Sequence, residues 1–173
     1  PRDLNFSWRG NLRLALTGEN GSGKSSLLKA ILGSPFETRG ELRRGGLKSL
    51  VLDQRCASLN DEKTIYENIR DEIALPESEI RTGLARFLFT RDTVFQKVKT
   101  LSGGERLRAA LARGFLSREK PQLLILDEPT AVLTPQEIEG LFEVMNLLRK
   151  QGKSIIFITH KLKEVLRVAD RIM

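Results

Sequence analysis

The sequence predicts an α/β fold in which helices flank a mostly parallel sheet, and two observations lead to that prediction. Short apolar runs rich in β-branched and aliphatic residues alternate with longer amphipathic stretches, as in strand and helix units around a parallel sheet. The length of 173 residues suits one domain, long enough to bury a core but too short for two. We therefore expect a single domain over residues 1–173.

Four apolar runs are the candidate strands of this sheet. Each run is flanked by Gly, polar or charged residues, as buried parallel strands are. The chain ends inside what resembles the start of a further strand, at Met173. The four runs are residues 12–16, 47–52, 123–126 and 154–158.

Helix start and stop signals separate these runs. A Gly-rich turn follows the first strand, and residues 24–32 form the next expected helix, which Gly33 ends with a left-handed cap. Capping boxes, in which a Ser or Thr is followed three residues later by Glu, open three further helices. Those boxes begin at Thr64, Ser102 and Thr134, and the last two helices run to about Leu116 and to Gly152.

The stretch between the second and third strands is expected to be helical. Residues 53–100 contain no evident strand, and a helix is expected from Pro76 to about Phe89. The stretch is too short to hold an independent core. We therefore expect a small helical subdomain, about 58–117, inserted into the sheet domain.

Composition excludes disordered, fibrous and membrane-spanning classes of protein. Hydrophobic residues make up 40% and charged residues 29% of the chain. The longest apolar runs have four residues, whereas roughly 20 are needed to cross a bilayer. The single cysteine, Cys56, cannot form an internal disulfide, and no secretory signal is visible. A cytoplasmic location is expected.

The net charge of +7 comes entirely from residues 1–121, because residues 122–173 carry seven basic and seven acidic side chains. Clustered Arg and Lys side chains in the first part could meet phosphates or RNA. A solvated surface that keeps the protein soluble is an equally good interpretation of the charge alone.

The strongest single motif is Gly18-Glu-Asn-Gly-Ser-Gly-Lys-Ser25, which matches the phosphate-binding loop in its required strand, loop and helix setting. Glycines let the backbone wrap around phosphates, and the following helix presents amide donors to an anion. We expect Lys24 to reach the β- and γ-phosphates of ATP and Ser25 to ligate Mg²⁺. The expected nucleotide-binding residues here are Gly18, Glu19, Asn20, Gly21, Ser22, Gly23, Lys24, Ser25 and Ser26.

Two carboxylates follow the third apolar run directly. Asp127 and Glu128 come after residues 123–126, and Pro129 stops further strand pairing. The carboxyl ends of strands are where α/β sheets bind ligands. We expect Asp127 to hold Mg²⁺ and Glu128 to polarise the water that attacks the γ-phosphorus.

The order of these motifs resembles a known family. Leu101-Ser-Gly-Gly-Glu105 stands between the phosphate loop and the two carboxylates, and it is similar to the signature sequence of the ATP-binding-cassette (ABC) ATPases. Gln54 is placed like that family's Q-loop glutamine, and His160 like its switch histidine. The resemblance covers nearly the whole chain and implies the P-loop NTPase fold.

The residues of the signature by themselves also predict a binding site for an anion. Its Ser and two Gly begin a helix whose free backbone amides, from Ser102 to Glu105, would form a second anion site. In the family, two cassette domains pack head to tail and each signature covers the γ-phosphate held by the other domain. The resemblance therefore implies a second cassette domain as partner, with nucleotide contacts from Ser102, Gly103 and Gly104.

The resemblance further implies ATP hydrolysis and a role for each remaining site residue. Gln54 would sense metal and water, and His160 would contact the γ-phosphate. The residues implied to be catalytic are Lys24, Gln54, Glu128 and His160. Those implied to hold Mg²⁺ are Ser25, Gln54 and Asp127.

Different parts of the chain resemble different subfamilies. Residues 1 to about 130 are similar to ABC-F proteins, which are soluble factors that act on ribosomes, and residues from about 127 onward are similar to ATPase subunits of sugar or nucleoside importers. This division indicates a chimeric cassette core, natural or engineered, with a divergent natural member as the alternative. The implied partner is the ribosome or RNA in the first case and a transporter membrane subunit in the second.

The chain departs from the family pattern at three places. Few residues precede Leu12, so we expect the usual hairpin with an adenine-stacking aromatic to be missing, and neither Phe6 nor Trp8 is expected to replace it. Thr134 stands where the family often has an interfacial aspartate, and the family's closing strands are expected to be absent. A cassette core shortened at both ends that binds nucleotide or phosphate with little or no hydrolysis is therefore the alternative function.

Overall fold

The structure is a computed structural model that describes residues 6–7, 10–19, 21–33, 41, 43, 45–52, 56 and 58–173. Five strands in this part of the chain form one sheet in the order β2-β3-β4-β1-β5, and every neighbouring pair is parallel. The strands are β1 (Arg13–Leu16), β2 (Ser49–Leu52), β3 (Leu123–Asp127), β4 (Ser154–Ile158) and β5 (Arg171–Ile172). The predicted α/β class is confirmed.

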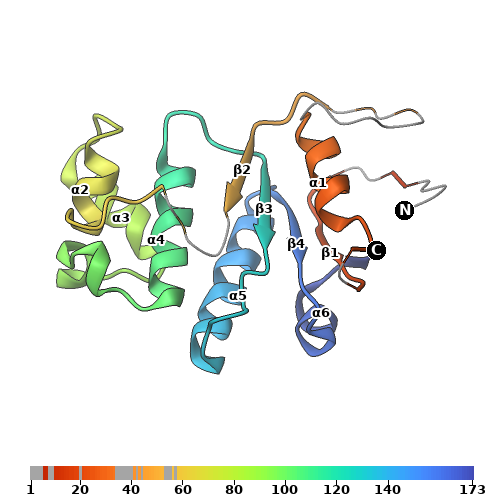
Figure 1. The fold of residues 1–173 in the computed structure, drawn as a ribbon. Coiled ribbons are helices and arrows are strands. Elements are labelled where there is room, and N and C mark those ends of the chain that lie inside the picture. The colour runs from red at the N-terminus through yellow and green to blue at the C-terminus, as the bar shows by residue number, and fades with distance from the viewer. Residues whose placement is uncertain are drawn as a thin grey trace.

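Helices cover both faces of this sheet, and Figure 1 shows α1 on one side and α4 with α5 on the other. Among the described residues no helix combines the length and the apolar character needed to cross a bilayer. The α-helices are α1 (Lys24–Leu32), α2 (Ile65–Arg70), α3 (Glu77–Ala85), α4 (Gly103–Leu116), α5 (Pro135–Lys150) and α6 (Leu162–Val168).

Alternating side chains of the central strands divide the core into two layers. Leu124 and Leu126 of β3 join the larger core, which also holds the apolar faces of α4 and α5. Leu123 and Ile125 point the other way and pack in the smaller core with Leu28 of α1. This period of two is what a strand buried on both faces requires, so the apolar runs of the sequence become the centre of the sheet.

The region from residue 58 to residue 117 is helical and contains no strand, as the sequence predicts. It comprises α2, α3, α4 and two short 3-10 helices, Arg91–Phe95 and Val98–Thr100. All three predicted capping boxes are present, with reciprocal side-chain and backbone bonds at the starts of α2, α4 and α5.

The helix expected from Pro76 to about Phe89 is shorter than predicted. It ends at Ala85, because Leu88 adopts a left-handed backbone with φ of +67°. The amide of Phe89 then donates to the carbonyl of Leu84 at 3.1 Å. This reversal turns Phe87 and Phe89 into the core, where they are 3% and 2% exposed.

Strand boundaries differ from the sequence expectation by one or two residues. The first two strands start at Arg13 and Ser49, while β3 extends through Asp127. The two-residue strand β5 confirms the further strand expected near the end of the chain and pairs with β1.

Candidate functional site

Three neighbouring strands bring the predicted functional groups to one edge of the sheet. Ile158, the last residue of β4, pairs with Leu16 of β1 on one side and with Asp127 of β3 on the other. The phosphate loop follows β1, while Glu128 and His160 come just after β3 and β4. Parallel sheets bind ligands at this edge, so the topology places the sequence motifs around one candidate nucleotide site.

The phosphate loop leaves the first amides of α1 open. Gly21 and Gly23 have φ of +82° and +95°, in the left-handed region that favours glycine, and Gly23 is the N-cap of α1. No side chain of the described residues caps this helix, and no acidic residue stands in its first turn. Ser22 tightens the loop by donating its amide to the Glu19 carbonyl at 3.2 Å. Asn20 lies outside the described residues.

Lys24 lies across its own loop. Its Nζ donates to the carbonyl oxygens of Gly18 and Glu19 at 2.7 and 2.9 Å. An anion bound in the loop would therefore compete with two carbonyls for this ammonium group. Ser25 and Ser26 follow in the first turn of α1, and Ser25 is exposed.

Glu128 and His160, predicted to act on water and on the γ-phosphate, lie beside each other. His160 Nδ1 is 3.3 Å from Glu128 Oε1, and their side chains are 65% and 29% exposed. The backbone of Glu128 is left-handed, with φ of +47°, and its amide donates to the Ile158 carbonyl at 3.1 Å. A carboxylate and an imidazole thus share one partly open position at the strand ends.

Two of the oxygen donors predicted for Mg²⁺ come from the start of α1 and the end of β3. Ser25 opens the helix after β1, and Asp127 ends β3 with a half-buried side chain. Hydroxyl and carboxylate oxygens are what Mg²⁺ prefers, with phosphate oxygens and water completing its shell. The described residues contain no cluster of three His, Cys, Asp or Glu side chains that could hold a metal unaided. Gln54 lies outside the described residues.

The signature residues open α4 as predicted, but their amides are not free. Ser102 donates its amide to Glu105 Oε2 at 2.9 Å and accepts from the Glu105 amide at 3.3 Å. Gly104 donates its amide to Oε1 of Glu137, at the start of α5, at 3.0 Å. The expectation of free amides is wrong at these positions, because carboxylates of the same chain already accept from them.

Glu137 is a neighbour of the signature that the sequence did not reveal. The pKa of its carboxyl is lowered to about 2, first because the Ser102 hydroxyl donates to it and also because the Thr134 and Gly104 amides do. A Cβ added to Gly104 would lie 2.6 Å from the Glu137 Cβ. Gly104 therefore permits the close approach of α5, and Glu137 supplies a negative charge at the helix start.

A buried polar group behind the site was also missed. Thr130, Thr159 and Glu164 are all nearly inaccessible to solvent. A signal was present in the sequence, because Glu164 falls beside Val165 and four residues before Val168, on the apolar side of α6. An acidic residue on such a face needs a buried partner.

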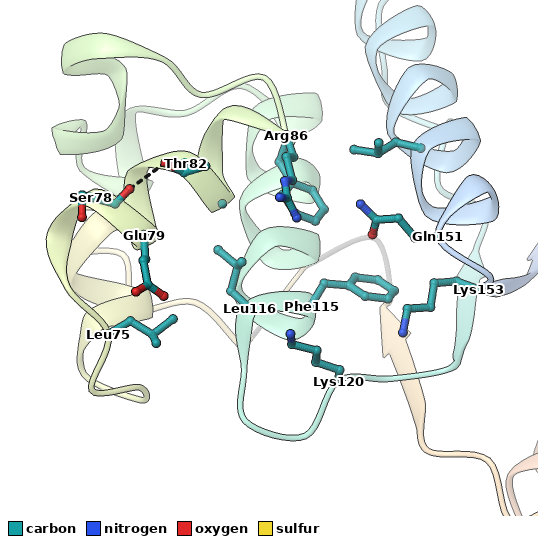
Figure 2. Close-up of a pocket in the computed structure, with 13 residues that line it drawn as sticks. Leu75, Ser78, Glu79, Thr82, Arg86, Phe115, Leu116, Lys120, Gln151 and Lys153 are labelled. Carbon is teal, nitrogen blue, oxygen red and sulfur yellow. Dashed lines mark hydrogen bonds between the residues drawn. The ribbon is translucent and has the colours of Figure 1, made fainter.

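The cavity shown in Figure 2 lies away from these groups. Its volume is about 380 Å³, and it is lined by α3, the end of α4 and the end of α5. Phe115 and Leu116 contribute apolar surface, while Arg86, Lys120 and Lys153 bring positive charge. None of the predicted nucleotide-site residues lines this cavity.

Comparisons with curated proteins identify relatives that are named as ATP-binding proteins. The ATP-binding protein YdiF of Bacillus subtilis is 38% identical over 161 residues, covering 92% of this chain and 24% of YdiF. The ribose import ATP-binding protein RbsA of Caldanaerobacter subterraneus is 34% identical over 185 residues, covering 94% of this chain and 37% of RbsA. The chain thus spans well under half the length of these relatives.

Solved structures share the fold. A metal-chelate type ABC transporter in an inward-facing conformation matches with a TM-score of 0.78 and 26% identity, over 98% of this chain and 70% of that chain. CbiO1 of Clostridium perfringens, part of the ABC transporter complex CbiONQ, matches with a TM-score of 0.83 and 22% identity, over 98% of this chain and 75% of that chain.

A family model described as ABC transporter matches residues 1–131, which include the phosphate loop, the signature and both carboxylates. Sequence motifs, strand order and fold neighbours agree with that match. The chain therefore belongs to the ABC transporter family.

Proposed function

We propose that this chain binds MgATP at the carboxyl edge of its sheet and hydrolyses it to ADP and phosphate in a head-to-tail pair of cassette domains. One observation carries the proposal: the phosphate loop, Asp127 with Glu128, and His160 follow three neighbouring strand ends. Phosphoryl transfer to water needs positioning and charge neutralisation more than covalent chemistry. The lysine, carboxylate and imidazole side chains at this edge can position the reacting groups and neutralise phosphate charge.

The phosphates of ATP are proposed to bind in the loop before α1. Loop amides and the uncapped start of α1 would donate to phosphate oxygens, and Lys24 would exchange its carbonyl partners for the β- and γ-phosphates. Ser25, Gln54 and Asp127 would hold Mg²⁺, which supplies neutralisation of phosphate charge. The loop residues proposed to contact nucleotide are Gly18, Glu19, Asn20, Gly21, Ser22, Gly23, Lys24, Ser25 and Ser26.

Water activation is assigned to Glu128. Its carboxylate would accept a proton from the attacking water, as a general base does. His160 would contact the γ-phosphate from a position beside Glu128. The 3.3 Å separation of His160 Nδ1 from Glu128 Oε1 agrees with this role. Gln54 completes the proposed catalytic set.

The signature is proposed to act on the nucleotide of a second cassette. The starts of α1 and α4 lie on opposite sides of the sheet in Figure 1, so the signature does not face the phosphate loop of its own chain. Val132, in the loop after β3, and Leu162, the first residue of α6, are 70% and 63% exposed. A partner domain at this edge would cover both side chains and bring Ser102, Gly103 and Gly104 of one domain to the phosphates of the other.

Of the two proposed processes we favour import, with this chain as part of the ATPase subunit of an importer. RbsA and the Escherichia coli D-allose import protein AlsA, 32% identical over 182 residues, are named as import ATP-binding proteins. A membrane subunit would then dock around the helical region, where the cavity of Figure 2 offers apolar surface rimmed by cations. The cassette would act on the cytoplasmic side of that subunit.

The resemblance to ABC-F proteins and the chimeric origin stay predictions. Sedimentation with ribosomes distinguishes the two processes. An ABC-F-like role requires binding that weakens steeply as salt is raised, because phosphate contacts release counterions. Absence of ribosome binding at low salt supports the importer role.

The test of the proposed function uses Glu128→Gln. Loss of the general base should slow ATP hydrolysis about 100-fold or more, while MgATP binding persists. Size-exclusion chromatography with light scattering should then show a MgATP-dependent shift from monomer to dimer, because the closed pair is trapped.

Glu143→Gln is the matched control, since Glu143 is an exposed residue of α5, a helix that holds none of the proposed site residues. It should hydrolyse ATP like the unaltered chain and show no trapped dimer. If Glu128→Gln stays monomeric although calorimetry detects ATP binding, the paired motor is contradicted. A cassette core that binds nucleotide with little hydrolysis then replaces it.

A further inference from the structure

A buried polar cluster lies behind the two groups proposed to act on water and on the γ-phosphate. Glu164 of α6 is 9% exposed, and Thr130 and Thr159 are each 3% exposed. A carboxylate so far from solvent requires hydrogen bonds or a cation, because the charge is otherwise poorly solvated. These three residues and Lys161 are named the Glu164 cluster.

Two bonds anchor Thr130 in the Glu164 cluster. Its Oγ1 donates to Glu164 Oε2 at 2.5 Å, and its carbonyl accepts from Lys161 Nζ at 2.7 Å. Thr130 stands two residues after Glu128. Both the side chain and the backbone of the loop after β3 are therefore held by residues that follow β4.

The loop of His160 is anchored to the same carboxylate. Thr159 Oγ1 donates to Glu164 Oε2 at 3.5 Å and accepts from the Lys161 amide at 3.1 Å. Lys161 Nζ also lies 3.4 Å from Glu164 Oε1. The two residues that bracket His160 thus belong to the cluster, which joins the two loops.

The backbone of Glu128 needs such support. Its φ of +47° is unfavourable for a residue with a Cβ and persists only where surrounding contacts hold it. Its amide donates to the Ile158 carbonyl at 3.1 Å, and its carbonyl accepts from the Ala131 amide at 3.2 Å. Thr130 lies inside that turn, so its bonds to the Glu164 cluster restrain the direction of the Glu128 side chain.

We infer that Glu164 is a positioning residue of the hydrolysis site. Through Thr130 and Lys161 it keeps the Glu128 carboxylate and the His160 imidazole in register, although it is not placed to touch nucleotide or water. The effect on hydrolysis rests on the function proposed above. The effect on the geometry of the two loops does not.

The test compares Thr130→Val with Thr130→Ser, which differ in whether the side chain can donate to Glu164. Thr130→Val and Glu164→Gln should lower kcat by roughly tenfold to hundredfold, because small misplacements of catalytic groups are costly, with KM for MgATP little changed. Thr130→Ser should retain the activity of the unaltered chain. Thermal unfolding of each variant shows whether it is folded at the assay temperature.

Glu139→Gln is the matched control. Glu139 pairs with Arg167 at 2.7 Å and so also links α6 to another element, but on the exposed surface. The same Glu→Gln change there removes a contact of α6 without touching either loop. It should leave kcat and KM unchanged.

A second measurement does not depend on turnover. His160 is the only histidine of the sequence, so its imidazole NMR signals can be assigned directly. These signals should shift or broaden in Thr130→Val and Glu164→Gln and stay in place in Thr130→Ser and Glu139→Gln.

The outcomes separate the two proposals. An unaltered chain that binds MgATP without hydrolysing it contradicts the proposed function, and the NMR comparison still decides whether Glu164 positions the loops. Folded Thr130→Val and Glu164→Gln with unchanged His160 signals overturn the positioning role. Equal losses of kcat in Glu139→Gln and Glu164→Gln overturn it as well, because any loosening of α6 would then suffice.

Discussion

Lys24 bonds to its own loop and is also the residue proposed to bind the phosphates of ATP. Its ammonium donates to the carbonyls of Gly18 and Glu19, so it shapes the loop around the place where phosphate is proposed to bind. The same three donors can turn to phosphate oxygens, which are charged and therefore stronger acceptors. The residue type required at this position follows from both tasks.

Lys24→Ala should weaken MgATP binding by roughly tenfold to hundredfold, because a hydrogen bond to a charged group contributes about 1.5 to 3 kcal/mol. Calorimetric titration of the folded variant with MgATP measures the change. Lys29→Ala is the control, since Lys29 is exposed in the last turn of the same helix. Equal affinities for both variants would contradict the assignment of Lys24 to the phosphates.

At the scale of elements, the contact of α4 with α5 depends on two adjacent glycines in different ways. A Cβ on Gly104 would lie 2.6 Å from the Glu137 Cβ, whereas a Cβ on Gly103 would meet nothing nearer than 3.5 Å, at Leu133 Cδ2. The second signature glycine therefore has a packing role in this chain. The first is free of that constraint.

Gly104→Ala should lower the free energy of unfolding by about 1 to 3 kcal/mol, as overpacking does. Gly103→Ala should be neutral or stabilising, because alanine favours the helix that begins there. Urea unfolding followed by circular dichroism compares the two. Equal stabilities would show that α5 moves aside without cost.

The bond between Glu137 and the start of α4 makes stability depend on pH. Folding lowers the pKa of Glu137 from 4.5 to about 2, so the stabilisation is present above about pH 4.5 and is lost as the pH falls toward 2. Glu137→Gln keeps an acceptor but not the charge. We expect it to be about 1 kcal/mol less stable than the unaltered chain at pH 7, after allowance for solvent screening.

Chemical unfolding at pH 7, 4 and 2.5 measures this difference. It should shrink as the pH falls, because protonation removes the charge that distinguishes the two chains. Glu143→Gln, at an exposed position of α5, provides the comparison for a general change of net charge. A difference that is independent of pH would contradict the charge-based explanation.

At the scale of the whole molecule, the central strands of the sheet are more deeply buried than the edge strands. Every residue of β4 and the first four of β3 are buried, whereas both residues of β5 and two of the four in β2 are exposed. The strands whose ends carry Asp127 and His160 are therefore the most deeply packed. The groups proposed to act on ATP therefore lie at the ends of the most deeply buried strands of the described sheet.

Hydrogen exchange should follow this order. Amides of β3 and β4 should exchange most slowly, and those of β2 and β5 faster, because segments with fewer buried contacts open at lower free energy. Addition of MgATP should slow exchange in residues 17–25 with little change in β5. Mass spectrometry of peptic fragments measures both effects, and uniform protection across the five strands would contradict this view of the sheet.

Local features of the chain were predictable because they depend on residues only a few positions apart. The span of α1, the three capping boxes and the left-handed Gly33 cap were all confirmed. The end of α3 was not predicted, because the buried Phe87 and Phe89 decide it and their burial depends on the helices around them. Propensity alone favoured a longer helix.

By itself the sequence determined the fold class, the order of the functional motifs and the residues that could bind phosphate. Each of these depends on the types and spacing of residues that are close together in the chain. Tertiary structure alone decided that the ends of β1, β3 and β4 meet at Ile158. It also decided which carboxylates bond to residues distant in the sequence: Glu137 contacts Gly104 across 33 positions, and Glu164 contacts Thr130 across 34. Such contacts follow from how strands and helices pack, which no local pattern encodes.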